Sequence, residues 1–364
     1  MPEMRIFILK YDVFASISMH KMGTQIKCIL KSNTISLNDL TNKTLVVDSY
    51  NFLYQFLTSI RSRDGSLLMD SKGSITSHLV GLFSRTTRLM QNNIKLIFVF
   101  DGEPPELKEK ERERRKNVKI NAEKEYKKAV EEENIEEMKK YASRTSRLTE
   151  DMIEESKKII SALGLPIIQA PSEGEAQAAY MVKNRDADYC VSQDFDSLLF
   201  GCPRLVRNLS LIGKRKKQGL SYETVNPEVI NLSENLNNLG IDQNQLIALA
   251  MLVGTDYNIG GVKGIGPKNA LKLVKKYGSN LDSLFKEVKW GDFFNYPWKE
   301  VYNLFKKIPV ISDYSVEWRE PDGREVIKLL VDEHDFAMDR VKPVLDRLLK
   351  NKESKQQKGL GEFF

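Results

Sequence analysis

Several short apolar runs in this sequence end in an acidic residue, and this pattern most restricts how the chain can fold. Each run is long enough for one buried strand, and amphipathic segments lie between the runs, so strands and helices alternate. Such alternation predicts an α/β fold with a mostly parallel central sheet and helices on both faces. Parallel strands share one carboxyl edge, where α/β proteins bind ligands. We therefore expect Asp48, Asp101 and Asp194 to converge there.

The stretch from 170 to 200 carries two pairs of carboxylates, each spaced two residues apart. Ser172 is expected to cap a helix, which would place Glu173 and Glu175 in its first turn, while Asp194 and Asp196 follow a short buried strand. Four carboxylates in one crevice repel each other and need protons or cations to coexist. Oxygen ligands suit Mg²⁺ or Mn²⁺. Taken alone, the four residues equally fit surface charge on a helix and a solvated turn.

Asp256, at the end of an apolar helix expected over 242–254, completes a set of acids that can face one edge. The set contains no histidine or cysteine, and it suits phosphodiester hydrolysis by two hard cations about 3.5–4 Å apart. The candidate metal ligands are Asp48, Asp101, Glu173, Glu175, Asp194, Asp196 and Asp256.

Composition excludes several other classes of protein. The net charge of the 364 residues is only +6, so a nucleic-acid signal has to come from where the charge lies. The three cysteines are scattered without a CxxC, which argues against a disulfide framework or zinc site and for a reducing compartment. No histidine accompanies a nucleophile motif. No long uncharged apolar run exists, so we expect no membrane association.

Two segments carry unusual charge or glycine patterns. From 106 to 140, 23 of 35 residues are charged, which cannot build a core. This stretch is either a solvated helix pair or a disordered insert, and its position after an acid-tipped strand makes it a candidate cover over the crevice.

Residues 260–278 are expected to form a tight glycine turn that leads into a basic helix. Farther on, a strand is expected near 325–331 in an otherwise helical region.

Together these motifs resemble the structure-specific flap endonucleases of the archaeal and eukaryotic type, a family of XPG/Rad-type 5′ nucleases. The resemblance covers residues 22–364 in the family's order. It rests on VVDSYNFLYQFL (46–57), VFDGEPPELK (99–108), PSEGEAQAAY (171–180), SQDFDSLLFG (192–201), LVGTDYNIGGVKGIGPKNALKLV (252–274) and QKGLGEFF (357–364).

The resemblance implies a role for individual residues. Asp48, Asp101, Glu173 and Glu175 match the first metal cluster, and Asp194, Asp196 and Asp256 match the second. Lys108 and Arg115 match arch residues that reach the scissile phosphate, and Tyr54 matches an aromatic that stacks on a base beside the cut. The implied catalytic residues are Lys108, Arg115, Asp48, Asp101, Glu173 and Asp194.

The glycine turn resembles a helix–two-turn–helix element that binds DNA phosphates and a K⁺ ion. Its matching residues are Gly261, Lys263, Gly264, Gly266 and Lys268. The last octet resembles the motif that docks replication enzymes on the sliding clamp of the PCNA type. Its matching residues are Gln357, Leu360, Phe363 and Phe364.

The expected organisation is a nuclease core over 22–349, with a helical arch at 106–147 and the helix–two-turn–helix element at 254–278. A flexible tail follows at 350–364. Residues 1–21 fit nothing downstream, so we expect them to be absent from the native enzyme, which would start at Met22, or to be disordered. The resemblance implies a monomeric, Mg²⁺-dependent enzyme that cuts 5′ flaps of branched DNA in replication and repair, in the archaeal cytoplasm and nucleoid or in the eukaryotic nucleus.

Three alternatives remain open. One is a 5′→3′ exonuclease or repair nuclease of the same superfamily. Another is a phosphatase with a DxD nucleophile at 194–196, although that motif follows a late strand in an all-acid cluster. The third is a DNA-binding adaptor of the clamp without catalysis.

Overall fold

The computed structural model describes residues 26–62, 65–132, 134–142, 145–211, 213–216 and 222–361. The expected extra segment 1–21 and the alternative start at Met22 lie outside these residues.

A seven-stranded sheet forms the centre of the described chain, in the order β1-β9-β6-β5-β2-β3-β4. Strands β6, β5, β2, β3 and β4 run parallel, whereas β9 is antiparallel to β6 and to β1. The predicted mostly parallel α/β sheet is therefore confirmed. The strands are β1 Asn33–Thr34, β2 Thr44–Asp48, β3 Lys95–Phe100, β4 Ile167–Gln169, β5 Tyr189–Val191, β6 Arg204–Arg207 and β9 Glu228–Asn231. A separate hairpin pairs β7 Gly213–Lys216 with β8 Tyr222–Val225.

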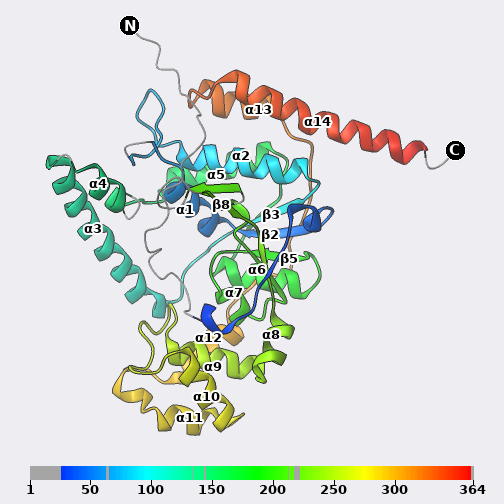
Figure 1. Ribbon diagram of the computed structural model, residues 1–364. Coiled ribbons are helices and arrows are strands. Elements are labelled where there is room, and N and C mark those ends of the chain that lie inside the picture. Colours follow the sequence, from blue (N-terminus) through cyan, green and yellow to red (C-terminus); the bar gives the residue numbers. More distant parts are fainter. Residues whose placement is uncertain are drawn as a thin grey trace.

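Alternation along the buried strands separates two cores, one on each face of the sheet. In β2, Leu45 and Val47 belong to one core and Val46 to the other. The first core lies under α1 Ser49–Ser59, α2 Ser77–Gln91, α5 Glu150–Ala162, α13 Gly323–Ile327 and α14 Met338–Gly361 (Figure 1). The second lies under α6 Gly174–Lys183, α7 Asp196–Leu199, α9 Gln243–Val253, α10 Pro267–Tyr277, α11 Leu281–Glu287 and α12 Trp298–Lys307. α8 Leu232–Leu239 also packs on this second core, through Leu232, Leu236 and Leu239.

The charged segment after β3 forms two helices that project from the body of the protein (Figure 1). These are α3 Glu109–Glu131 and α4 Ile135–Ala142, which pack against each other. Most described residues of α3 are exposed to solvent, as 23 charged residues among 35 require. The structure therefore agrees with the interpretation of this segment as a solvated helix pair.

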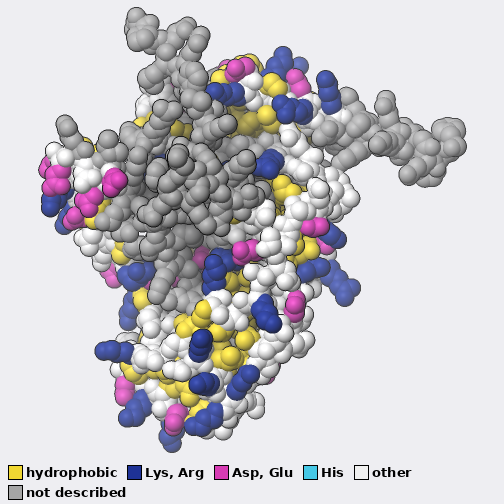
Figure 2. Space-filling view, viewed as in Figure 1, with side chains coloured by type: hydrophobic (Ala, Val, Ile, Leu, Met, Phe, Trp, Pro, Cys, Tyr) yellow, Lys and Arg dark blue, Asp and Glu magenta, His cyan; other side chains and the backbone are white. Residues whose placement is uncertain are grey.

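A helical lobe that contains α9, α10 and α11 lies at the opposite end of the molecule from α13 and α14 (Figure 1). Its surface gathers many Lys and Arg side chains (Figure 2). The exposed lysines of α10 are Lys268, Lys272, Lys275 and Lys276. This lobe therefore offers a surface suited to a polyanion.

The strand expected near 325–331 is wrong, because the chain is helical there. α13 covers Gly323–Ile327 and one π-helical turn follows at Lys328–Asp332. The Asp322 side chain accepts hydrogen bonds from the backbone N–H groups of Arg324 and Glu325 and so caps the helix. Val326, Leu329 and Leu330 are buried, and their spacing of three and four residues fits one helical face.

The C-terminal helix continues past the expected start of the tail at 350. α14 ends at Gly361, so its backbone includes Gln357 and Leu360. Phe363 and Phe364 lie outside the described residues. No described helix has both the length and the apolar character needed to cross a membrane.

Candidate active site

The carboxyl edge of the parallel sheet brings the predicted acids together. Asp48 ends β2, Asp101 directly follows β3, and Asp194 lies three residues beyond β5. α6 packs against these three strands and supplies Glu173 and Glu175. Asp196 begins α7, and Asp256 follows α9. Each of these seven carboxylates takes part in a repulsion that raises the pKa of an acid in the set. The acids therefore lie close together, as predicted.

The helix that carries the two glutamates begins later than expected. Glu173, and not Ser172, occupies the N-cap position of α6, and the Ser172 hydroxyl donates instead to the carbonyl of Glu103 at 2.9 Å. The first N–H of the helix, on Gly174, donates to Asp101 Oδ1 at 2.7 Å. A Cβ at position 174 would lie 2.5 Å from that oxygen, so glycine is needed for this close approach.

Two polar side chains that sequence reasoning missed hold the carboxylates in place. Asn51 Nδ2 donates to Asp194 Oδ2 at 3.0 Å, and the Asn51 backbone N–H donates to Asp48 Oδ1 at 3.1 Å. The Ser192 hydroxyl donates to Glu175 Oε1 at 2.8 Å and accepts the N–H of Asp194 at 3.1 Å. Their positions were a usable signal, because Asn51 lies one helical turn after Asp48 and Ser192 directly follows β5.

Burial and mutual repulsion make the crevice hard to ionise. Burial is the main reason that the pKa values of Asp48 and Glu175 lie well above their ordinary range, with repulsion from neighbouring acids adding to it. Burial also raises the pKa of Asp194 to about 7, and repulsion by Asp196 and Asp256 contributes. The pKa of Glu173 is likewise raised by burial. The cluster therefore needs positive charge to ionise fully near neutral pH.

Two cations from the projecting segment supply part of that charge. Lys108 Nζ lies 2.5 Å from Glu173 Oε2 and 3.7 Å from Asp256 Oδ2. Arg115 Nη2 donates to both carboxylate oxygens of Asp256, at 2.8 and 2.9 Å. The structure thus places both predicted arch residues against the predicted metal ligands.

The donor set has the chemistry that hard divalent cations need. Among the described residues, no three acidic, histidine or cysteine side chains are arranged to hold one ion as they stand. The buried Glu173 Oε1, however, has no hydrogen-bond partner among them. A buried carboxylate oxygen without a partner is costly, and a metal ion would satisfy it. All seven donors are carboxylates, which suits Mg²⁺.

Tyr54 of α1 faces the arch. Lys119 Nζ of α3 lies 3.1 Å from the Tyr54 hydroxyl and 4.9 Å from the centre of its ring. The Tyr54 side chain is half-buried, so part of its surface remains accessible. The contact of Tyr54 with a base of the DNA stays a prediction.

The turn between α9 and α10 has the backbone expected of a tight glycine loop. Gly261 has φ +60°, and a Cβ there would lie 2.4 Å from the carbonyl oxygen of Leu252, so its glycine is needed for packing. Gly264 has φ +88° and open space where a Cβ would be. Lys263 and Lys268 are exposed on either side of Gly264. A phosphate can therefore approach the turn on the side of Gly264.

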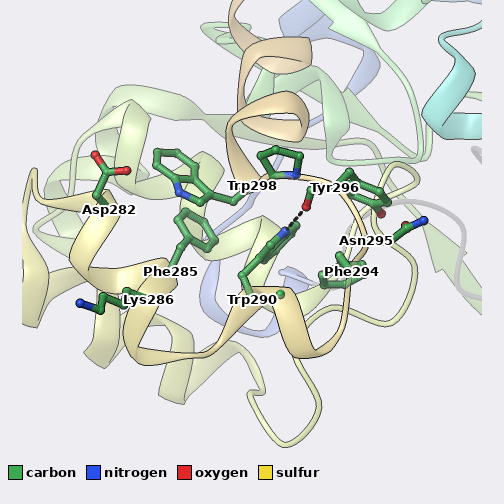
Figure 3. Close-up of a pocket in the computed structure, with 10 residues that line it drawn as sticks. Asp282, Phe285, Lys286, Trp290, Phe294, Asn295, Tyr296 and Trp298 are labelled. Carbon is green, nitrogen blue, oxygen red and sulfur yellow. Dashed lines mark hydrogen bonds between the residues drawn. The ribbon is translucent and has the colours of Figure 1, made fainter.

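A shallow, mostly apolar pocket in the same lobe has none of the seven candidate metal ligands in its lining. Its aromatic side chains pack on one another: Phe285 stacks on Trp298 with ring centres 4.6 Å apart, and Trp290 Nε1 donates to the carbonyl of Tyr296 (Figure 3). The acid of its rim, Asp282, is paired with Lys299. The aromatic residues mainly build the core of the lobe.

The fold and the buried crevice of carboxylates define an XPG-type nuclease. Residues 18–122 match the XPG N-terminal domain, and residues 164–256 match the XPG I-region. The catalytic core of Rad2 in complex with DNA substrate has the same fold, with a TM-score of 0.64 at 24% identity over 89% of this chain and 97% of that one.

Proteins with higher sequence identity to this chain show which family within this class it belongs to. The chain is 49% identical to flap endonuclease 1 of Hyperthermus butylicus over 90% of this chain and 95% of that protein. It is also 49% identical to flap endonuclease 1 of Pyrococcus furiosus, over 94% and 99%. The structure of flap endonuclease-1 from Methanococcus jannaschii matches with a TM-score of 0.71 and 46% identity, over 92% of this chain and 100% of that one. The chain belongs to the flap endonuclease 1 family, and it is a metal-dependent nuclease that acts on DNA.

Proposed function

We propose that this enzyme uses Mg²⁺ to cleave branched DNA at the base of 5′ flaps, leaving a 3′-hydroxyl and a 5′-phosphate. It would do so in Okazaki fragment maturation and repair, with an associated 5′→3′ exonuclease activity. The observation that carries the proposal is the convergence of seven carboxylates, without histidine or cysteine, at the carboxyl edge of the sheet. Family membership supports the choice of flap DNA as substrate.

The carboxylates would hold two Mg²⁺ ions, for which Mn²⁺ can substitute. Asp48, Asp101, Glu173 and Glu175 would serve the first, and Asp194, Asp196 and Asp256 the second. Bound there, the ions supply Lewis-acid activation of water and charge stabilisation at the leaving oxygen. The protein orients these carboxylates by hydrogen bonds. The donors are the Gly174 N–H to Asp101, the Ser192 hydroxyl to Glu175 and the Asn51 amide to Asp194.

The arch cations would bind the scissile phosphate. Lys108 and Arg115 already lie against the carboxylates, so a phosphate entering the crevice meets both side chains. An arginine and a lysine placed in a partly buried site stabilise the charge that develops on a phosphate during hydrolysis. Tyr54 would stack on the base beside the cut, since stacking on an aromatic ring tolerates any sequence.

The basic lobe would hold the duplex part of the substrate. Gly264 and Gly266 leave open space for a phosphate, and Lys263 and Lys268 supply charge beside them. We propose that this turn also holds a K⁺ ion, for which backbone carbonyls would supply the oxygen ligands. Gly261 shapes the backbone there. Phosphate contacts of this kind give affinity without sequence preference.

The proposal also includes a protein partner and a cellular compartment. Gln357, Leu360, Phe363 and Phe364 would dock a monomeric enzyme on a PCNA-type sliding clamp. The described cysteines Cys28, Cys190 and Cys202 are free thiols, in keeping with a reducing compartment that holds replicating DNA.

Single-turnover cleavage of a 5′-flap DNA in Mg²⁺ tests the proposal directly. Asp194→Ala should abolish cleavage while the affinity for the flap, measured in Ca²⁺ or EDTA, changes little, because phosphate contacts elsewhere dominate binding. Asp151→Ala, which removes an exposed acid on α5, is the matched control and should cleave normally. Cleavage by Asp194→Ala at near the wild-type rate would show that the metal assignment is wrong.

A further inference from the structure

Glu111 is a buried carboxylate on α3, a helix whose described residues are mostly exposed. Among the described residues of α3, only Glu111, Ala122 and Ala129 are buried, and the Glu111 residue is 3% exposed. Glutamate is almost never buried to this degree unless it is paired. Its neighbours Glu109 and Glu113 on the same helix are exposed. The burial of Glu111 therefore calls for a specific explanation.

Both oxygens of Glu111 accept hydrogen bonds from two consecutive arginines. Arg114 Nε donates to Oε2 and Arg114 Nη2 to Oε1, each at 2.6 Å, which is a bidentate pair. Arg115 Nε donates to Oε1 at 2.7 Å. The spacings of three and four residues place all three side chains on one face of the helix. Arg114 thus fixes the plane of the carboxylate, and the carboxylate fixes Arg115.

The other end of the Arg115 guanidinium contacts Asp256, through Nη2. The guanidinium is therefore held between two carboxylates, one on its own helix and one in the acidic crevice. Asp256 belongs to the proposed metal ligands, whereas Glu111 does not. Of the two, Glu111 is the carboxylate whose hold on Arg115 does not compete with metal binding.

We infer that Glu111 is a positioning residue for Arg115 and orients its guanidinium toward the scissile phosphate. The inference rests on the proposed function, in which Arg115 contacts that phosphate. An arginine has many rotamers, and fixing one of them in advance removes an entropy cost from the reaction. A charged acceptor at Nε leaves the Nη groups directed at the crevice, where the phosphate would lie.

The test compares two charge-neutralising substitutions in the first turn of α3, Glu111→Gln and Glu109→Gln. Both remove one negative charge near the helix N-terminus, so any effect of the helix dipole is shared. With a 5′-flap DNA in Mg²⁺, Glu111→Gln should lower the single-turnover rate about tenfold, since a small misplacement of a reacting group has large effects. Its affinity for the flap should stay within about twofold of the wild type. Glu109→Gln should match the wild type in both.

A double-mutant cycle with Arg115→Ala distinguishes positioning from general support of the helix. If Glu111 acts through Arg115, adding Glu111→Gln to Arg115→Ala causes no further loss of rate. A second loss of about tenfold in that background, or an equal loss in Glu109→Gln, would overturn the inference. Melting temperatures of all variants check that each is folded. A wild-type enzyme that leaves the flap uncut would instead overturn the proposed function.

Discussion

Asn51 and Asp194 join the first helix to the loop after β5 by a hydrogen bond of 3.0 Å from Nδ2 to Oδ2. The Asn51 carbonyl oxygen Oδ1 also accepts the N–H of Gln193 at 3.1 Å, so the amide is fixed on both sides. Its backbone N–H holds Asp48. One residue thereby connects a member of each proposed metal cluster.

Asn51→Ala is expected to weaken metal binding about tenfold, the lower end of what loss of a partner to a metal ligand costs. The substitution keeps the backbone N–H to Asp48 and removes only the support of Asp194. Titration of the DNA-free protein with Mn²⁺, followed by electron paramagnetic resonance, measures the affinity apart from catalysis. Thr58→Ala, on an exposed position of α1, is the control. Equal Mn²⁺ affinity in the two variants would show that Asn51 does not support the site.

Mg²⁺ should stabilise the protein more at pH 8 than at pH 6. Asp194 has a pKa of about 7 against an ordinary value of 3.8, chiefly through burial. The folded protein therefore binds more protons than the unfolded chain between these values. The stability that Asp194 contributes is complete below about 3.8 and is lost as the pH rises through about 7. Metal replaces the missing proton by binding only the folded state.

Thermal melts in EDTA and in Mg²⁺ across this pH range measure the effect. The melting temperature in EDTA should fall from pH 6 to pH 8, and Mg²⁺ should reverse the fall. Asp194→Asn, which cannot ionise, should flatten the EDTA profile. A Mg²⁺-induced shift that is the same at both pH values would contradict the expectation.

Tyr54→Ala should slow cleavage, whereas Tyr54→Phe should leave it close to the wild type. Stacking of a base on an aromatic ring is worth about 1–3 kcal/mol, which corresponds to roughly five- to 150-fold in rate when the stack forms at the transition state. The phenylalanine keeps the ring and loses only the hydroxyl that contacts Lys119. Single-turnover rates on one flap substrate decide between them. If Phe and Ala slow cleavage equally, the hydroxyl matters and the ring does not.

The convergence of the acids could be predicted from the sequence because it depends on features that are local. An apolar run followed by Asp48, Asp101 or Asp194 defines a strand and its carboxyl end, and the chirality of parallel connections then places these ends together. The charge density of 106–140 likewise predicted a segment that lies outside any core, but it left a helix pair and a disordered insert both open.

The contacts within the site could not be predicted, since they depend on register and rotamers. Whether Ser172 or Glu173 caps α6 is decided by the close fit of Gly174 on Asp101, which no spacing reveals. Glu111 is indistinguishable by sequence from the exposed glutamates around it. The error at 325–331 arose because Val326, Leu329 and Leu330 are apolar and include a β-branched residue, while the capping role of Asp322 was overlooked.

The C-terminal octet gives the last prediction. Leu360 precedes Phe363 and Phe364 by three and four residues, so one helical turn would place the three side chains on one face, with Gln357 a further turn back. Large apolar side chains on a polar segment are costly in water and favour docking in a partner's groove. α14 is helical up to Gly361, and its described C-terminal part points away from the nuclease body (Figure 1).

Phe363→Ala combined with Phe364→Ala should therefore abolish binding to a PCNA-type clamp and the stimulation of cleavage by it. Cleavage without the clamp should be unchanged, because the acidic crevice lies on the rigid sheet edge, far along the chain from the tail. Calorimetric titration with the clamp and flap cleavage with and without it measure the two effects. Leu349→Ala, at an exposed apolar position earlier in α14, controls for general loss of apolar surface. Full clamp stimulation of the double variant would refute the docking role, and a loss of clamp-free activity would show that these aromatics also serve the nuclease body.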